Sequence, residues 1–333
     1  MFPFFSKKSF IALIATVTLT SPLQLNVSAN SKDGEEKISS KEVQIGDLDV
    51  TVYEDGRVKG LGKSKKLSNK NRKQVLKLMR FTEEEIDSLP EELQNELVSE
   101  GGVKVDSKVE DFVHIYTDLD GNDHEVTEEN KKEIEKIKKR DYKKIQEMSA
   151  KGKVIAAGTD LGSETDGDFT GTGHIIYRGI EGNEYGYMYY TKFEWSDRPA
   201  LYFTDTLGHT WQNHTTSIGS ASDYDVRYFN GNGDPLGTID FEPELDNSDV
   251  LGTKGEFDID YHAGVHYGYI RDRVRIPRTE KGNTGQFASA YAHSWSNANM
   301  ELAFRYISID ISGLGDKWSW KNSFEIGTEK EVN

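Results

Sequence analysis

The strongest constraint on the fold is a run of aromatic residues that recurs at every second position near the middle of the chain. The odd-numbered positions of this run carry Tyr185, Tyr187, Tyr189, Thr191, Phe193 and Trp195. Side chains two positions apart lie on one face of a β-strand, whereas a helix would spread them around its axis. Aromatic residues also favour the pleated, half-buried surface of a sheet. The segment is therefore predicted to be a long antiparallel strand with one aromatic face.

The same alternation returns throughout the C-terminal half, and turn residues separate the segments that show it. Strands are predicted near residues 172–179, 200–205, 223–230, 255–261, 267–278, 285–293, 299–311 and 317–326. Gly- and Asn-containing turns such as Glu181-Gly-Asn183 and Lys281-Gly-Asn283 lie between them. A series of strands without a helical segment among them is typical of antiparallel sheets packed face to face. Residues 171–333 are therefore predicted to form a mainly β domain, a β-sandwich or jelly roll.

Residues 30–126 have another composition, rich in Lys, Glu and Leu and without any tryptophan. A hairpin is predicted at Asp55-Gly56, and the apolar spacing of residues 69–79 predicts a helix. The segment Thr82-Glu-Glu-Glu85 has the spacing of a capping box, and Pro90 begins a further helix. Short strands and helices together predict a small α+β domain in this part of the chain.

Residues 127–170 are predicted to connect the two domains. A charged helix is expected first, with a thin apolar stripe made of Ile134, Ile137, Ile145 and Met148. The Gly- and Asp-rich run from Gly158 to Asp168 then predicts a linker. The expected order is therefore a small N-terminal domain, a helix with its linker, and a C-terminal sandwich.

The first 29 residues are predicted to be a cleaved export signal. Lys7 and Lys8 give a short positive region, and an apolar run follows from Phe10 to Thr20. This run is too short to span a bilayer, which takes about 20 apolar residues, and the small residues ending at Ala29 suit a signal peptidase. We therefore expect a secreted, extracellular protein that is not an integral membrane protein.

Charge and cysteine content narrow the function further. The chain contains 57 Asp and Glu residues against 41 Lys and Arg residues, so its net charge is −16. Binding to nucleic acid depends on Lys and Arg at the phosphates, so nucleic acid is not an expected partner. The chain has no cysteine and therefore no disulfide bond. Among exported proteins, this favours a Gram-positive source.

Several stretches of the chain resemble a group of secreted proteins. In the C-terminal half these are Phe193-Glu-Trp-Ser-Asp-Arg-Pro-Ala-Leu-Tyr-Phe-Thr-Asp-Thr-Leu-Gly-His-Thr-Trp-Gln-Asn-His214 and Tyr291-Ala-His-Ser-Trp295. In the N-terminal half, Phe81-Thr-Glu-Glu-Glu-Ile86 followed by Leu89-Pro90 and Gly101-Gly102 is similar to a leader domain of the same group. The group consists of uncharacterised secreted proteins of Bacillus-type Gram-positive bacteria. The resemblance implies an extracellular location and supplies no catalytic residues.

The aromatic face and the tryptophans are the first candidate for a functional site. Alternate aromatic residues on a half-buried strand are what the core of a sandwich needs, so the interior is one interpretation. The other is an exposed platform whose rings stack on sugars or contact a protein partner. The ligand-binding candidates on that interpretation are Tyr187, Tyr189, Trp195, Trp211, Trp295 and Trp318.

Acidic loops are the second candidate, because calcium binds several hard oxygens from a flexible loop and is plentiful outside the cell. The most suitable loop carries Asp160, Glu164, Asp166 and Asp168. A similar set follows residue 117, although its Asp-Gly pair also fits a hairpin turn: Asp118, Asp120, Asn122 and Asp123. His209 and His214 are five positions apart, so neither a strand nor a helix points both at one metal ion. No cofactor is expected, apart from a calcium ion in such a loop.

An enzymatic function is left open and is not favoured. Glu194 and Asp205 stand on strands that can be neighbours, and two carboxylates about 5 to 9 Å apart suit glycoside hydrolysis. The chain lacks the Gly-x-Ser-x-Gly, His-Glu-x-x-His and phosphate-loop motifs and any cysteine nucleophile. The favoured function is non-enzymatic binding of an extracellular glycan or protein. The alternatives are a secreted glycan-acting hydrolase and, from the amphipathic strands and the Ser/Thr-rich stretch 215–222, a toxin or antagonist acting on neighbouring cells.

Overall fold

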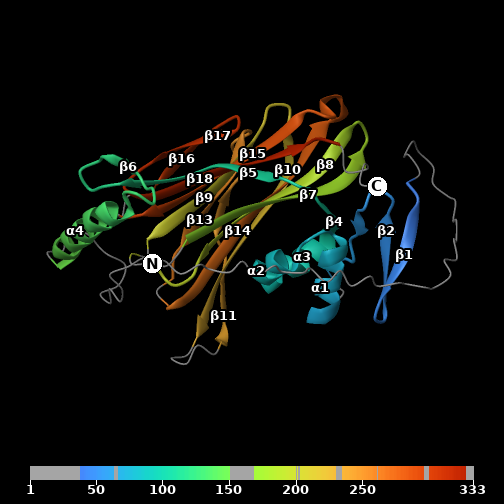
Figure 1. Ribbon diagram of the computed structural model, residues 1–333, viewed down its shortest axis with the longest axis horizontal. Coiled ribbons are helices and arrows are strands. Elements are labelled where there is room, and N and C mark those ends of the chain that lie inside the picture. The colour runs from blue at the N-terminus through green and yellow to red at the C-terminus, as the bar shows by residue number, and fades with distance from the viewer. Residues whose placement is uncertain are drawn as a thin grey trace, which may run out of the picture. The chain divides into compact units, whose positions relative to one another are not determined.

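The predicted aromatic strand is β8 (Glu184–Trp195), and it lies near the middle of a nine-stranded sheet (Figure 1). In spatial order the sheet consists of β1 (Ser40–Ile45), β2 (Leu48–Tyr53), β3 (Val58–Lys59), β4 (Gly101–Lys104), β7 (Phe169–Glu181), β8, β14 (Gly264–Pro277), β10 (Thr216–Phe229) and β11 (Pro235–Phe241). β8 pairs antiparallel with β7 and β14 along almost its whole length. The long alternating segments therefore form the centre of the sheet.

A second, seven-stranded sheet packs against the first. Its order is β12 (Glu244–Asp246), β13 (Gly252–Asp258), β9 (Thr204–Trp211), β15 (Thr284–Ser294), β18 (Gly315–Glu325), β5 (Lys108–Thr117) and β6 (Asp123–Glu125). Aromatic rings from the two sheets meet between them, as where Tyr189 of β8 stacks on Phe287 of β15 with 4.2 Å between ring centroids. The prediction of a mainly β, antiparallel sandwich is confirmed.

The structure describes residues 38–63, 67–150, 169–199, 201, 203–229, 235–260, 262–295 and 300–327. The predicted export signal and the acidic loop with Asp160, Glu164, Asp166 and Asp168 lie outside these residues. None of the described helices is both long and apolar enough to span a membrane.

The helices are α1 (Asn69–Leu78), α2 (Glu83–Ser88), α3 (Glu91–Glu100) and α4 (Lys131–Ala150), with a short 3₁₀ turn η1 (Arg278–Glu280). The predicted capping box is present, because the Glu85 N–H donates to Thr82 Oγ1 and the Thr82 N–H donates to Glu85 Oε2. Apolar side chains of α1 to α3 pack with Met188, Tyr190 and Tyr269 of the nine-stranded sheet. The predicted α+β character of the N-terminal region is thus present.

The N-terminal region contributes strands to both sheets of the sandwich. β4 pairs with β7, through Val103 and Tyr177, and β5 pairs with β18 along most of its length. A boundary at residue 126 was predicted because composition changes there, yet β5 and β6 precede that boundary and belong to the seven-stranded sheet. Composition reports on local segments, whereas hydrogen-bonded pairing joins segments that are distant in the chain. Residues from Lys37 onward form one compact unit.

Several strand predictions differ from the structure. The segment 299–311 is a hairpin, β16 (Glu301–Arg305) and β17 (Ser308–Ser312), whose turn contains Ile307 at φ 54°. The apolar alternation changes from even to odd positions between Tyr306 and Ile307, which is where the turn lies. β9 begins at Thr204, near the end of the predicted segment 200–205, and β11 was not predicted.

Candidate functional site

The structure places the six candidate ligand-binding aromatics in the interior. None of the six is more than 6 % exposed: Tyr187, Tyr189, Trp195, Trp211, Trp295 and Trp318. Trp195 packs edge-on against Trp318 and donates from Nε1 to Tyr291 Oη at 2.8 Å. This corresponds to the core interpretation of the alternating pattern. The exposed-platform interpretation does not apply, because rings that other side chains cover cannot stack on a ligand.

Glu194 and Asp205, the carboxylates considered for glycoside hydrolysis, belong to different sheets. Asp205 is fully buried, and it accepts hydrogen bonds from Tyr291 Oη and, at 2.9 Å, His293 Nδ1. Burial raises the pKa of Asp205 although His293 opposes the shift. Glu194 pairs with Lys192 on its own strand at 2.8 Å. Each carboxylate is therefore engaged separately by neighbouring side chains.

His209 lies in the interior and is hydrogen-bonded on both ring nitrogens. Its Nε2 lies 2.7 Å from Asp272 Oδ2 on β14, and its Nδ1 lies 2.9 Å from Thr191 Oγ1 on β8. Asp272 is also fully buried. Its other oxygen accepts from Ser217 Oγ at 2.6 Å and Ser220 Oγ at 2.8 Å. Burial favours the neutral acid, but these partners outweigh it and hold the pKa of Asp272 below its usual value.

The two serines bound by Asp272 lie on either side of a β-bulge. The register of β10 against β14 shifts between Ser217 and Gly219, so Ile218 is the extra residue. Ile218 is 47 % exposed. Asp272 therefore fixes, from the interior, the backbone that presents an apolar side chain at the surface.

Thr210, the next residue after His209, organises two further segments on the opposite face of the sheet. Its Oγ1 lies within hydrogen-bonding distance of the carbonyl oxygens of Leu251 and Arg305, the latter at 2.9 Å. Leu251 ends the loop between β12 and β13, and Arg305 ends β16. Because one buried hydroxyl contacts both carbonyl oxygens, the two segments lie close to each other.

These three segments form what we call the apolar loop surface: residues 217–220, 247–251 and 305–307. Asn247 Nδ2 joins the first two, at 3.5 Å from Ser220 Oγ. Each segment exposes one large apolar residue, namely Ile218, Val250 at 83 % and Tyr306 at 50 %. Nothing in the sequence indicates this surface, because single apolar residues in turns are common and the segments are brought together by the contacts of Asp272 and Thr210.

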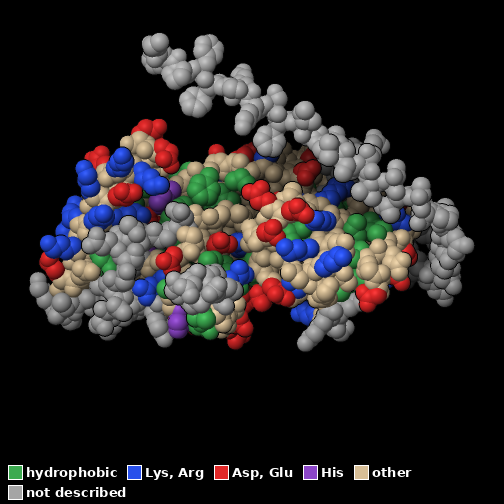
Figure 2. All heavy atoms as spheres, turned by 60° about the horizontal axis from the view of Figure 1, so that its bottom comes forward, with side chains coloured by type: hydrophobic (Ala, Val, Ile, Leu, Met, Phe, Trp, Pro, Cys, Tyr) green, Lys and Arg blue, Asp and Glu red, His purple; other side chains and the backbone are tan. Residues whose placement is uncertain are grey.

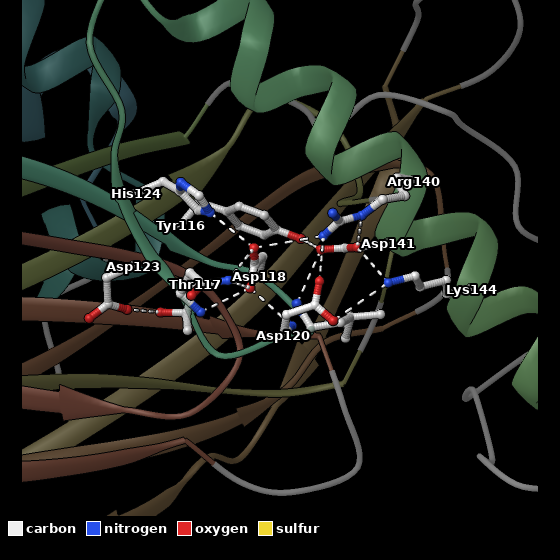
Figure 3. Close-up of polar contacts among 11 residues, drawn as sticks. Tyr116, Thr117, Asp118, Asp120, Asp123, His124, Arg140, Asp141 and Lys144 are labelled. Carbon is white, nitrogen blue, oxygen red and sulfur yellow. Dashed lines mark hydrogen bonds and ion pairs between the residues drawn. The ribbon is translucent and has the colours of Figure 1, made fainter.

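A second polar cluster lies where the β5–β6 turn meets α4, and Figure 3 shows its contacts. Asp141 of α4 is fully buried and accepts from Tyr116 Oη and from the Leu119 N–H, both at 3.1 Å. The Arg140 Nε donates to the same carboxylate at 2.7 Å. These contacts fasten the middle of α4 to the end of the seven-stranded sheet.

Asp118 closes the β5–β6 turn, as the hairpin interpretation expects. Its Oδ1 accepts the N–H groups of Asp120 and Asn122, both at 2.9 Å, and its Oδ2 lies 3.0 Å from His124 Nε2. Burial raises its pKa, but these hydrogen bonds outweigh burial and hold the pKa well below the usual range. Among the described residues, no group of three or more His, Cys, Asp or Glu side chains is placed to hold a metal ion.

A pair of carboxyl groups gives the fold a predicted pH dependence. Asp225 and Asp240 are cross-strand partners on β10 and β11, and burial, the hydrogen bond with Asp240 and the charges of Asp223, Glu92 and Asp240 raise the pKa of Asp225 to about 8. The folded state thus binds a proton that an ordinary aspartic acid loses near pH 4, so stability falls as pH rises from about 4 to 8. We expect the loss in free energy of unfolding between pH 4 and pH 8 to be about 2 kcal/mol smaller in Asp225→Asn than in the wild type, after allowance for screening by water.

Urea unfolding between pH 4 and 9 checks this prediction. The urea concentration at the midpoint of unfolding should fall toward pH 8 in the wild type. It should fall much less in Asp225→Asn. Asp246→Asn is the matched control, because the pKa of exposed Asp246 is lowered by Ser248. A wild type and an Asp225→Asn variant with parallel profiles would contradict the prediction.

Comparison with known proteins does not assign the chain to a family. No family model matches it, and no curated protein matches it. Among solved structures, the collagen binding subdomain of the Enterococcus faecalis surface protein ACE is 10% identical, with a TM-score of 0.25, over 46% of this chain and 92% of that one. A pore forming protein is 9% identical, with a TM-score of 0.26, over 47% of this chain and 91% of that one.

Clostridium perfringens delta-toxin is 6% identical, with a TM-score of 0.26, over 48% of this chain and 89% of that one. At these TM-scores the likenesses carry no argument about the function of this chain. The class of protein is therefore given by the fold itself: a mainly β, antiparallel sandwich with a helical N-terminal region.

Proposed function

We propose that the chain is a secreted, non-enzymatic protein that binds an extracellular partner through the apolar loop surface. The observation that carries the proposal is the way this surface is built. Ile218, Val250 and Tyr306 are exposed, while the segments that carry them are held by the buried side chains of Asp272 and Thr210. Apolar side chains held in fixed positions at the surface lose little entropy when a partner covers them.

An extracellular location is supported by the predicted export signal over residues 1–29 and by the resemblance to secreted proteins of Bacillus-type bacteria. The geometry does not favour a glycan-acting hydrolase, because Glu194 and Asp205 contact different side chains. Action on the membranes of neighbouring cells is a second candidate. Exposed Ile218 and Tyr306 favour it, since apolar residues on protruding loops can enter a bilayer interface.

The test is a triple substitution, Ile218→Ser, Val250→Ser and Tyr306→Ser, in the full chain. Losing three apolar contacts should weaken binding at least about tenfold, which corresponds to about 1.4 kcal/mol. Binding is measured on arrays of extracellular matrix proteins and cell-wall glycans, and leakage is measured on dye-loaded phosphatidylcholine vesicles.

The matched control removes three exposed apolar residues elsewhere, with the substitutions Val109→Ser, Phe112→Ser and Leu236→Ser. A protein or glycan retained by the wild type and by this control, but lost by the loop variant, would support the proposal. Vesicle leakage that only the loop variant loses would favour the membrane candidate. Equal binding by all three proteins, or cleavage of an arrayed glycan, would overturn the proposal.

A further inference from the structure

Helix α4 is a basic element in an acidic chain. Residues Lys131–Ala150 contain eight Lys and Arg residues and four Asp and Glu residues, giving a local charge of +4 where the whole chain carries −16. Lys and Arg side chains gather at the left end of Figure 2, the end at which α4 lies in Figure 1. The helix therefore presents a charge opposite to that of the protein as a whole.

Four of the lysines form a straight row, which we call the lysine row: Lys132, Lys136, Lys139 and Lys143. Their spacings of four, three and four residues, at 100° per residue, place them within an arc of about 60° on the helix. With a rise of 1.5 Å per residue, the row is about 16 Å long. All four side chains are exposed.

The buried face of α4 fixes the direction in which the lysine row points. Ile134, Tyr142 and Ile145 pack into a cluster with Tyr116 of β5 and with Trp295, which follows β15. On that same side Lys138 forms an ion pair with the fully buried Asp316 at 2.7 Å. The lysine row lies on the opposite side of the helix, so it faces solvent.

The charges of the lysine row are not used within the described part of the protein. Its neighbours Arg140 and Lys144 form ion pairs with Asp120, at 3.4 and 3.7 Å, as Figure 3 shows. No described carboxylate lies within ion-pair distance of a lysine of the row. The opposite face of α4 is packed against the protein, so the helix is held in place. The four lysines of the row are therefore available to a partner.

We propose that the lysine row binds a linear phosphate polymer outside the cell. Successive lysines are about 4.5 to 6 Å apart along the helix axis, which suits a chain with one phosphate per short repeat. An anionic membrane fits less well, because exposed Glu135 and Glu147 flank the row where membrane-binding helices carry apolar residues. This site is separate from the apolar loop surface, so the proposal goes beyond the function proposed above.

The probe is long-chain inorganic polyphosphate, with orthophosphate as the monomeric control and binding followed by fluorescence anisotropy of the labelled full chain. At 20 mM salt we expect binding of the polymer but not of orthophosphate. Four phosphate contacts with a flexible chain give a slope of about −3 for log K against log salt concentration. The variant Lys132→Gln, Lys136→Gln, Lys139→Gln and Lys143→Gln should bind at least about tenfold more weakly and lose most of this slope.

A second quadruple variant, Lys41→Gln, Lys70→Gln, Lys108→Gln and Lys281→Gln, changes the net charge equally at exposed lysines on other elements. The proposal is supported if this control keeps wild-type affinity while the lysine-row variant loses it, with unchanged circular dichroism in both. It is overturned if both variants lose affinity equally, or if the wild type does not bind polyphosphate. Stronger binding to phosphatidylglycerol vesicles or to single-stranded DNA of equal charge would also overturn it.

Discussion

Replacing Asp272 by alanine should lower the free energy of unfolding by about 3 to 5 kcal/mol, because one substitution leaves several buried groups without their partner. His209 Nε2, Ser217 Oγ and Ser220 Oγ all meet this carboxylate, and all three contacts are 2.8 Å or shorter. The bulge that presents Ile218 would lose its anchor at the same time. Urea unfolding at pH 7 measures the loss of stability.

Asp272→Asn is the conservative control, and it should cost only about 1 to 2 kcal/mol, because the amide oxygen can still accept from the two serines. The pH dependence gives a second readout. The lowered pKa of Asp272 stabilises the fold at neutral pH, and this contribution is lost as pH falls below the usual range of an aspartic acid. The difference between wild type and Asp272→Ala should therefore shrink toward pH 3. A loss below about 1 kcal/mol at pH 7 would contradict the assigned contacts.

Trp195→Ala should be as destabilising, at about 3 to 5 kcal/mol, since it leaves a large cavity between the sheets. Trp195 is 1 % exposed and contacts Phe169, Trp318 and Tyr291. The substitution also removes the donor to Tyr291 Oη. Thermal and urea unfolding of the purified variant measure the effect.

Trp195→Phe separates the two contributions, because it keeps most of the apolar volume and removes only the indole N–H. We expect it to cost about 1 to 2 kcal/mol. An exposed platform residue would behave differently, with a stability change within about 0.5 kcal/mol and a selective loss of binding. That pattern in Trp195→Ala would restore the platform interpretation and contradict the buried position of the ring.

The parts of the fold that depend on residues close together in the chain were predictable from the sequence. The capping box at Thr82 and the aromatic alternation ending at Trp195 are local patterns with one dominant structural solution. Strand pairing was not predictable in this way. β5 has an irregular, exposed sequence around Asp111, and nothing in it indicates that β18 is its neighbour. For this reason the predicted boundary at residue 126 separates β5 and β6 from the other strands of their sheet.

The apolar loop surface was hidden from the sequence for a related reason. His209 and Thr210 are adjacent, and their side chains point to opposite faces of β9, where they fix different segments. The spacing of His209 and His214 argues against a metal site, and nothing else in the sequence indicates a role for His209. Its role depends on Asp272, which is 63 positions away and shows no recognisable motif.

The pairing of β5 with β18 also determines when the fold can be completed. Lys321 Nζ and Asp111 Oδ2 lie 3.2 Å apart across these strands, although 210 positions separate them in the chain. The seven-stranded sheet cannot close before residues Gly315–Glu325 are available, and contacts between such distant segments form slowly. A chain that emerges from the ribosome with its N-terminus first therefore remains open until its last strand has been made. If the predicted export signal directs the chain across a membrane, this delay would keep the polypeptide unfolded enough to be threaded through a translocon.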